Sequence, residues 1–162
     1  MHRRVLAALL TLAAWPPRNA AAQGRPVLRV TGTFAGVPGR EAVFDLARLE
    51  GLGTVRLVTR TAWTGSTPQL FSGVPLARVL EAVGAEGESL RAVALNDYAV
   101  TLPIEDATRH GAVLATRHDG VPMRVRDRGP IWLLYPWTER PELDTPVFRE
   151  RAIWQLAQIH VG

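Results

Sequence analysis

The chain has 162 residues, no cysteine and a formal net charge of +4 at neutral pH. Without cysteine it has no disulfide, no thiolate metal ligand and no thiol nucleophile. Its 19 basic side chains are all arginines, and Arg3, Arg4 and Arg18 precede residue 23, which leaves 16 basic side chains against 15 acidic ones in the rest. This near balance gives no reason to expect a nucleic-acid partner.

Residues 1–22 predict a cleavable signal peptide. A basic start is followed by an apolar run over residues 5–15, which is shorter than the roughly 20 residues of a membrane-spanning helix. Two prolines then end the run, and the small residues Ala20 to Ala22 predict cleavage after Ala22. We therefore expect a periplasmic or secreted protein without a transmembrane anchor, and a single domain over residues 23–162.

The export route stays open at this point. Arg3 and Arg4 form a pair that resembles the twin-arginine signals of proteins exported in the folded state. The leucine-rich run that follows suits export of an unfolded chain equally well.

The first half of the domain shows strand and turn patterns. Alternating apolar residues predict a strand over 28–34, and the glycines of residues 36–39 predict a turn. A short helix is expected over 44–52, with Asp45 as its N-cap, followed by a strand over 55–59. Residues 60–69 are polar and predict a loop.

The second half contains the clearest helix, over residues 76–83, because its apolar residues recur at helical spacing between Pro75 and Gly84. Further strands are expected, with a turn at Asn96 and Asp97 and a helical turn at 105–110. These strands and the closing bend plus strand are residues 90–95, 99–104, 112–117, 131–135 and 152–161. Strands outnumber helices and do not alternate with them regularly, which predicts an α+β domain.

Several segments occur in an order and spacing that resemble one family. They are residues 73–76, 95–98, 102–103, 115–123, 128–130 and 154–161. Together they resemble the sulfite-oxidase-like oxidoreductase molybdopterin-binding domain superfamily, and in particular its small exported members. The resemblance spans residues 71–161 and implies a mixed β-sheet domain with a cofactor cleft beside these loops.

The chain departs from this family at the positions that hold the cofactor. In cofactor-loaded members a cysteine thiolate coordinates molybdenum, and the matching place falls near Thr59. The family commonly has histidine, arginine and lysine at the positions that here hold Arg128, Trp132 and Ile153. Because two of these three positions have lost a cation, the resemblance implies weaker binding of the pterin phosphate. We expect no molybdenum chemistry and no resident cofactor, with molybdopterin held without a thiolate as the alternative.

Arg124, Arg126 and Arg128 alternate along a segment that we expect to be extended, which would place their side chains on one face. Like charges repel, so acidic partners or a bound anion should offset them, and arginine binds carboxylate, sulfate or phosphate well. The alternative is a solvated strand edge whose charges prevent aggregation, and the 15 acidic residues favour it.

Asp97 and Tyr98 match the family at the edge of its pocket, where a carboxylate and a phenol can orient a ligand. A local turn that uses Asn96 and Asp97, with Tyr98 packed beside it, explains the same residues.

Four tryptophans are candidates for an apolar pocket wall. Trp63 and Trp137 have polar neighbours and are the better candidates, whereas Trp132 and Trp154 lie in apolar runs and are expected in the core.

No catalytic or metal-binding motif is present in the sequence. His110, His118 and His160 lack the spacing of a metal site, and the serine nucleophile elbow and glycine-rich phosphate loops do not occur. We therefore assign no catalytic residue and no metal ligand.

Three functions compete. The favoured one is a sensory or accessory module that binds a small anion or a pterin-like ligand. The second is a periplasmic molybdopterin-dependent oxidoreductase with water or Thr59 in place of the thiolate, and the third is a protein-interaction domain without a ligand. The candidate ligand-binding residues are Thr59, Trp63, Asp97, Tyr98, Arg124, Arg126, Arg128 and Trp137.

Overall fold

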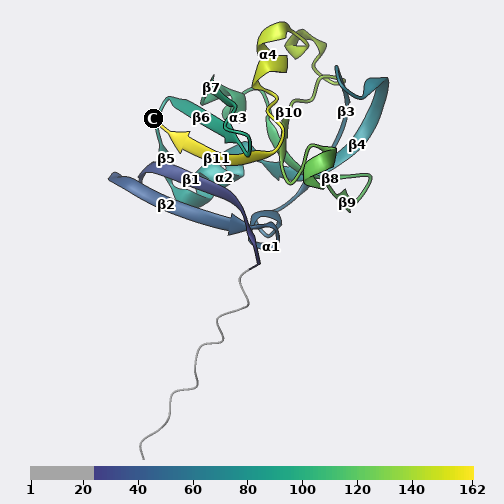
Figure 1. Cartoon of the computed structure of the whole chain (residues 1–162). Coiled ribbons are helices and arrows are strands. Elements are labelled where there is room, and N and C mark those ends of the chain that lie inside the picture. Colours follow the sequence, from purple (N-terminus) through teal and green to yellow (C-terminus); the bar gives the residue numbers. More distant parts are fainter. Residues whose placement is uncertain (1–23) are drawn as a thin grey trace, which may run out of the picture.

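Two β-sheets organise the protein in the computed structural model, which describes residues 24–162 (Figure 1). The predicted signal peptide lies outside the described residues. Sheet A has the strand order β2-β1-β11-β6-β7, with β5 beside β1, and sheet B has the order β10-β8-β4-β3, with β9 beside β8. The pairing of β1 with β11 is parallel and the others are antiparallel, which confirms the predicted mixed sheet of an α+β domain.

Sheet A begins with a strand whose alternating side chains bury Leu28 and Val30 in the core. Its strands are β1 (Pro26–Phe34), β2 (Val37–Asp45), β5 (Ala85–Glu86), β6 (Ser89–Ala94), β7 (Ala99–Pro103) and β11 (Leu156–Val161). Gly32 lies so close to the carbonyl oxygen of Val161 that a Cβ atom there would collide with it. This close approach lets β1 pair with the last strand of the chain.

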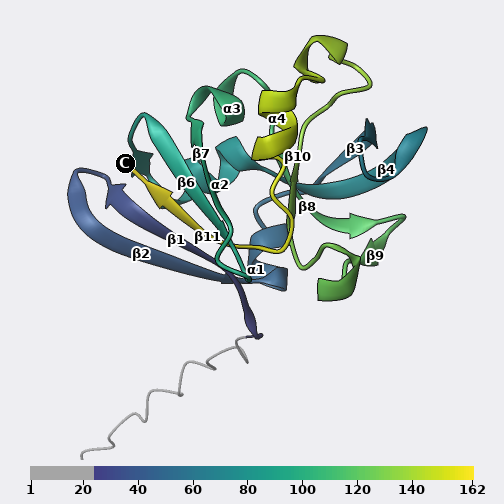
Figure 2. The ribbon, with the colours of Figure 1, turned by 45° about the horizontal axis from the view of Figure 1, so that its top comes forward.

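The strands of sheet B are β3 (Val55–Thr61), β4 (Gly65–Pro75), β8 (Val113–His118), β9 (Val121–Pro122) and β10 (Trp132–Leu134). All three residues of β10 are buried, as the apolar run over 131–135 predicts. Figures 1 and 2 show that the hairpin of β3 and β4 lies on the side of the molecule away from β2.

Four short α-helices complete the domain: α1 (Leu46–Glu50), α2 (Leu76–Val83), α3 (Glu105–Thr108) and α4 (Pro146–Arg151). Two 3₁₀ turns span Val125–Asp127 and Pro141–Leu143. Asp45 caps α1 as expected, and Gly84 ends α2 in the left-handed conformation that favours glycine. In residues 24–162 no helix is long and apolar enough to cross a membrane.

Four local predictions are wrong in whole or in part. Gly36 lies in a turn as expected, but residues 37–39 of the predicted turn belong to β2. The start of the helix expected at 44 also belongs to β2, and the loop expected at 60–69 contains the end of β3 and the start of β4. Residues 37–41 and 65–68 are exposed, so neither strand shows apolar alternation there, and backbone pairing with a neighbour specifies them instead. Residues 124–128 are not extended either, because a 3₁₀ turn runs through them.

Candidate functional site

Trp63 lies in the turn between β3 and β4 at the centre of a cluster of indole rings. Its ring centroid is 5.8 Å from that of Trp132, 5.5 Å from that of Trp154 and 6.4 Å from that of Trp137. The contacts with Trp132 and Trp154 are edge-to-face, the arrangement that aromatic quadrupoles favour.

The turn that carries Trp63 is held by one buried hydroxyl. The Oγ1 atom of Thr61 accepts hydrogen bonds from the backbone N–H groups of Trp63 and Thr64, at 3.2 and 3.0 Å. Thr61 is only 4% exposed, so these bonds form out of contact with water and fix the direction in which the indole leaves the hairpin.

Arg128 joins this cluster through its guanidinium group. The guanidinium carbon lies 5.1 Å from the ring centre of Trp132 and 5.9 Å from that of Trp154. Both distances allow a cation–π attraction. The backbone N–H of Gln155 donates to the carbonyl oxygen of Arg128 at 2.9 Å, and Gln155 Nε2 donates to that of Val125 at 2.8 Å. The segment after α4 therefore ties the arginine-bearing loop to Trp154.

A groove of about 610 Å³ opens beside Trp132, and we call it the arginine groove. The side chains that give it charge and shape are Thr64, His118, Arg124, Arg126, Arg128 and Trp132, with Asp127 as its one acidic residue. Arg124 pairs with Asp127 at 2.6 Å, and Arg126 reaches the same carboxylate only at 4.0 Å. Arg124 and Arg126 therefore share one carboxylate and Arg128 pairs with none in residues 24–162, which leaves the groove positive.

The three arginines converge, but for a different reason from the one that the sequence suggests. The 3₁₀ turn over Val125–Asp127 and the left-handed backbone of Arg128, with φ +73°, gather them around the groove. Strand alternation plays no part. Gly129 permits the turn, because a Cβ atom at this position would collide with the backbone carbonyl of Met123.

A second pocket, of about 290 Å³, lies on the other side of the indole cluster, and we call it the aromatic pocket. Its walls include Trp63, Trp154, Tyr98, Asn96 and Arg149. Tyr98 is 51% exposed and Trp154 is 37% exposed, so both present ring surface to a ligand. Trp63 and Trp154 line this pocket while their neighbours Thr64 and Trp132 line the arginine groove, which makes the two hollows adjacent.

Three predicted site residues line neither hollow. Thr59 is fully buried, and its hydroxyl donates to the backbone carbonyl of Tyr135 at 3.0 Å. Trp137 is 1% exposed, and its Nε1 donates to the carbonyl of Leu143 at 3.0 Å. Asp97 occupies the turn between β6 and β7 with φ +65°, between the pocket residues Asn96 and Tyr98.

The tryptophans divide differently from the sequence prediction. Trp132 is buried as expected and still forms a wall of the arginine groove. The expectation of core packing is wrong for Trp154, whose partly exposed ring lines the aromatic pocket, and Trp137 takes the core position instead. The local sequence does not distinguish Trp137 from Trp154, because the position of the β3–β4 hairpin in the fold determines which indole ring is covered.

Sequence reasoning missed a buried charged network behind the aromatic pocket. Asp106 is fully buried in α3, and its carboxylate accepts hydrogen bonds from Tyr135 Oη at 2.6 Å and from Arg151 at 3.1 Å, with His110 Nδ1 at 3.0 Å. Burial, and then the bond to Asp106, raise the pKa of Tyr135 well above its ordinary value. The four-residue spacing of Asp106 and His110 is the one sequence signal that indicates this contact.

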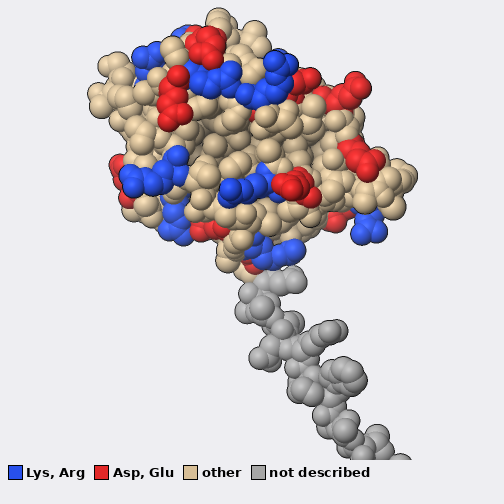
Figure 3. Space-filling model, turned by 180° about the vertical axis from the view of Figure 1, so that it is seen from behind, with Lys and Arg blue, Asp and Glu red and all other residues tan. Residues whose placement is uncertain are grey.

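The described residues contain no group of three His, Asp or Glu side chains arranged to hold a metal ion. Charged side chains of both signs are interspersed over the face in Figure 3, so that face is not a general basic surface. A family model described as the oxidoreductase molybdopterin binding domain matches residues 36–139, which is more than half of the chain. Comparison with curated proteins gives no match.

Proposed function

The chain belongs to the oxidoreductase molybdopterin-binding domain family, and from that premise we propose that it is an exported sensory or accessory module whose arginine groove binds a small anion or the phosphate of a pterin-like ligand. The observation that carries the proposal is the convergence of Arg124, Arg126 and Arg128 on one groove with a single carboxylate. Export rests on the predicted signal peptide of residues 1–22.

The residues of this chain do not fit direct ligation of molybdenum. This metal favours soft thiolate ligands, and the chain has no cysteine. Thr59, near the place of the family's thiolate, has its hydroxyl committed to the carbonyl of Tyr135 and no exposed surface. The proposed function therefore assigns the metal no role.

The same residues do fit an anion. A guanidinium presents its N–H donors in one plane, so it can stack on an aromatic face and still offer a fork of donors to phosphate at its edge. The guanidinium of Arg128 lies over the ring of Trp132, and within residues 24–162 no carboxylate lies within 4.0 Å of it. Its orientation is thus fixed before a ligand binds, which lowers the entropy cost of binding.

The aromatic pocket supplies a place for the rest of such a ligand. Flat indole and phenol rings provide apolar surface for a heteroaromatic ring, and Asn96 and Tyr98 offer polar groups at its edge. A ligand with a planar ring and a phosphate could contact both hollows on either side of Arg128.

Isothermal titration of the full-length protein with dihydroneopterin phosphate and with unphosphorylated dihydroneopterin tests this proposal. We expect the phosphorylated pterin to bind more tightly, with an affinity that falls as salt is raised. The Arg128→Gln variant should weaken that binding by about tenfold, the effect of one lost charge-assisted hydrogen bond. Arg91→Gln is the matched control, since Arg91 is exposed on β6 outside both hollows.

Two results would contradict the proposal. One is equal binding of the two pterins by the wild type and the Arg128→Gln variant. The other is molybdenum near one atom per chain in protein purified from a host that makes the cofactor, which would favour the oxidoreductase alternative.

A further inference from the structure

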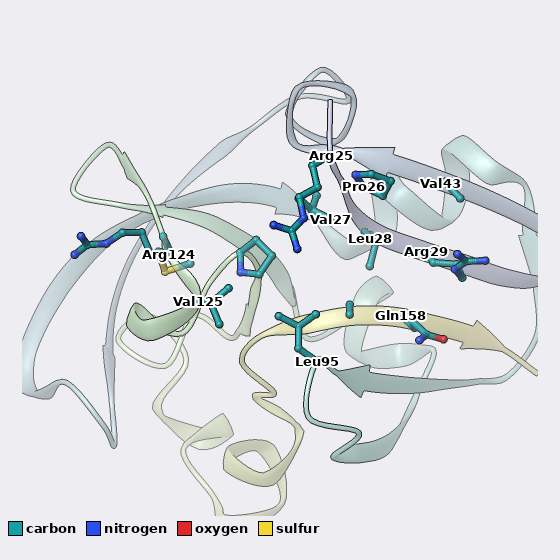
Figure 4. Close-up of a pocket in the computed structure, with 13 residues that line it drawn as sticks. Arg25, Pro26, Val27, Leu28, Arg29, Val43, Leu95, Arg124, Val125 and Gln158 are labelled. Carbon is teal, nitrogen blue, oxygen red and sulfur yellow. The ribbon is translucent and has the colours of Figure 1, made fainter. Parts of the chain in front are cut away.

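A third pocket, of about 380 Å³, lies at the start of the domain, between the outer face of sheet A and the loop before β10 (Figure 4). We call it the β1 pocket. It falls within the range of about 300–1,000 Å³ typical of small-molecule sites. It shares Arg124 with the arginine groove, and the function proposed above uses none of its other charged side chains.

The floor of the β1 pocket is one face of sheet A. Arg29 of β1 is the register partner of Val43 on β2 and of Gln158 on β11, so these three residues lie side by side across the sheet. All three line the pocket, as does Val27, which lies at the irregularity in the pairing of β1 with β2.

The opposite wall is aliphatic and partly exposed. Leu95 and Val125 are 51% and 53% exposed, and Figure 4 shows them on the same side of the pocket, across from Arg25. Pro130 extends this wall toward the core. About half of each of the Leu95 and Val125 side chains is exposed, so an apolar ligand would remove them from water.

All the charged side chains that line the β1 pocket are basic. Arg25, Arg29 and Arg124 line it, and no acidic side chain does. Arg29 is paired with Glu41 at 2.7 Å and Arg124 with Asp127 at 2.6 Å, whereas Arg25 makes no ion pair with any residue of the described part. In Figure 4 the guanidinium of Arg25 extends over the middle of the pocket, and that of Arg124 points away from it.

We propose that the β1 pocket binds a small anionic amphiphile, an aliphatic chain that ends in a carboxylate, with the carboxylate on Arg25 and the chain against Leu95 and Val125. A bare anion would leave the aliphatic wall in contact with water. A neutral apolar molecule would cover Arg25 without pairing its charge, which is costly. A carboxylate on an aliphatic chain satisfies both parts of the pocket, because arginine forms two parallel hydrogen bonds with a carboxylate.

The test is isothermal titration of the full-length protein with decanoate below its micelle concentration, beside decanol and acetate. We expect decanoate to bind, and decanol and acetate to bind at least about tenfold more weakly because each lacks one half of the recognised chemistry. Arg25→Gln should weaken decanoate binding by about tenfold, and Val125→Asp, at an exposed position that tolerates a polar side chain, should abolish it.

Two variants separate this site from the arginine groove. Arg91→Gln should leave decanoate binding unchanged. Arg126→Gln lies in the arginine groove and outside the β1 pocket, so it should weaken the phosphorylated pterin and leave decanoate unaffected. Equal affinity for decanoate and decanol, or decanoate binding that neither Arg25→Gln nor Val125→Asp changes, would overturn the proposal.

Discussion

Asp106 is an acidic side chain with no exposed surface, and three other side chains surround its carboxyl group. Tyr135 reaches it from the end of β10, His110 from the segment after α3 and Arg151 from the last turn of α4. In Figures 1 and 2 α3 and α4 lie at the same end of the molecule, and the hydrogen bond from Arg151 to Asp106 joins these two helices. A buried charge is tolerated when it is paired and hydrogen-bonded in this way.

At the residue scale we predict that Asp106→Asn lowers the free energy of unfolding by about 3 kcal/mol or more, because the variant leaves the Arg151 guanidinium without its buried partner. Urea denaturation at neutral pH measures this loss. The control is Glu142→Gln, which removes an exposed partner of Arg140 and should give an unfolding curve that superimposes on that of the wild type. A loss below about 1 kcal/mol for Asp106→Asn would show that the network contributes little.

A carboxylate also joins secondary-structure elements far apart in the sequence. Glu50, at the end of α1, accepts hydrogen bonds from Arg117 Nε and Nη2 at 2.8 and 3.0 Å and from Thr116 Oγ1 at 2.8 Å. Both donors lie on β8 of sheet B. The hydrogen bonds from Arg117, and secondarily from Thr116, lower the pKa of Glu50 below its ordinary value of 4.5, against the opposing effect of partial burial.

At the element scale this lowered pKa predicts a pH-dependent contribution to stability. Because the folded pKa lies below the unfolded one, the contribution is fully present above about pH 4.5 and is lost as the pH falls through the folded pKa. We expect Glu50→Gln to be less stable than the wild type at pH 7, and the difference in unfolding free energy to shrink below pH 4.5. The exposed Glu81→Gln variant of α2 should show no such trend. If the difference in unfolding free energy between Glu50→Gln and the wild type stays constant from pH 7 to pH 3, this account is refuted.

The secondary-structure elements also show which features local sequence patterns can predict. The helix over 76–83 and the hairpin of β6 and β7 are predicted correctly, because helical periodicity and a turn-forming pair are local signals. The strands β2 and β4 are missed over their whole length, although Phe44, Phe71 and Val74 are buried in them. Their backbone hydrogen bonds to β1, β3 and β8 define them, and no local pattern encodes those partners.

At the scale of the whole molecule, the proposal of export makes a prediction about the mature chain. Protein recovered from the periplasm should lack residues 1–22 and begin at Gln23, which intact-mass measurement and N-terminal sequencing would show. Replacing Ala22 by phenylalanine should block this processing, since the cleavage site requires small residues. Full-length protein found only in the cytoplasm would contradict export. A requirement for Arg3 and Arg4 would favour the twin-arginine route.

The sequence alone determined the α+β class, the family resemblance and the absence of a thiolate ligand. Composition, periodicity and the order of motifs can be established without knowing which distant residues are in contact. It also indicated Trp63, Tyr98 and the three arginines as candidate ligand-binding residues. Only the tertiary structure showed that the arginines gather around a 3₁₀ turn and that Trp154, not Trp137, lines a pocket. It also showed that Thr59 is fully buried, with its hydroxyl bonded to the carbonyl of Tyr135. These outcomes depend on which strands and loops lie against one another, and contacts between residues distant in the sequence fix that arrangement.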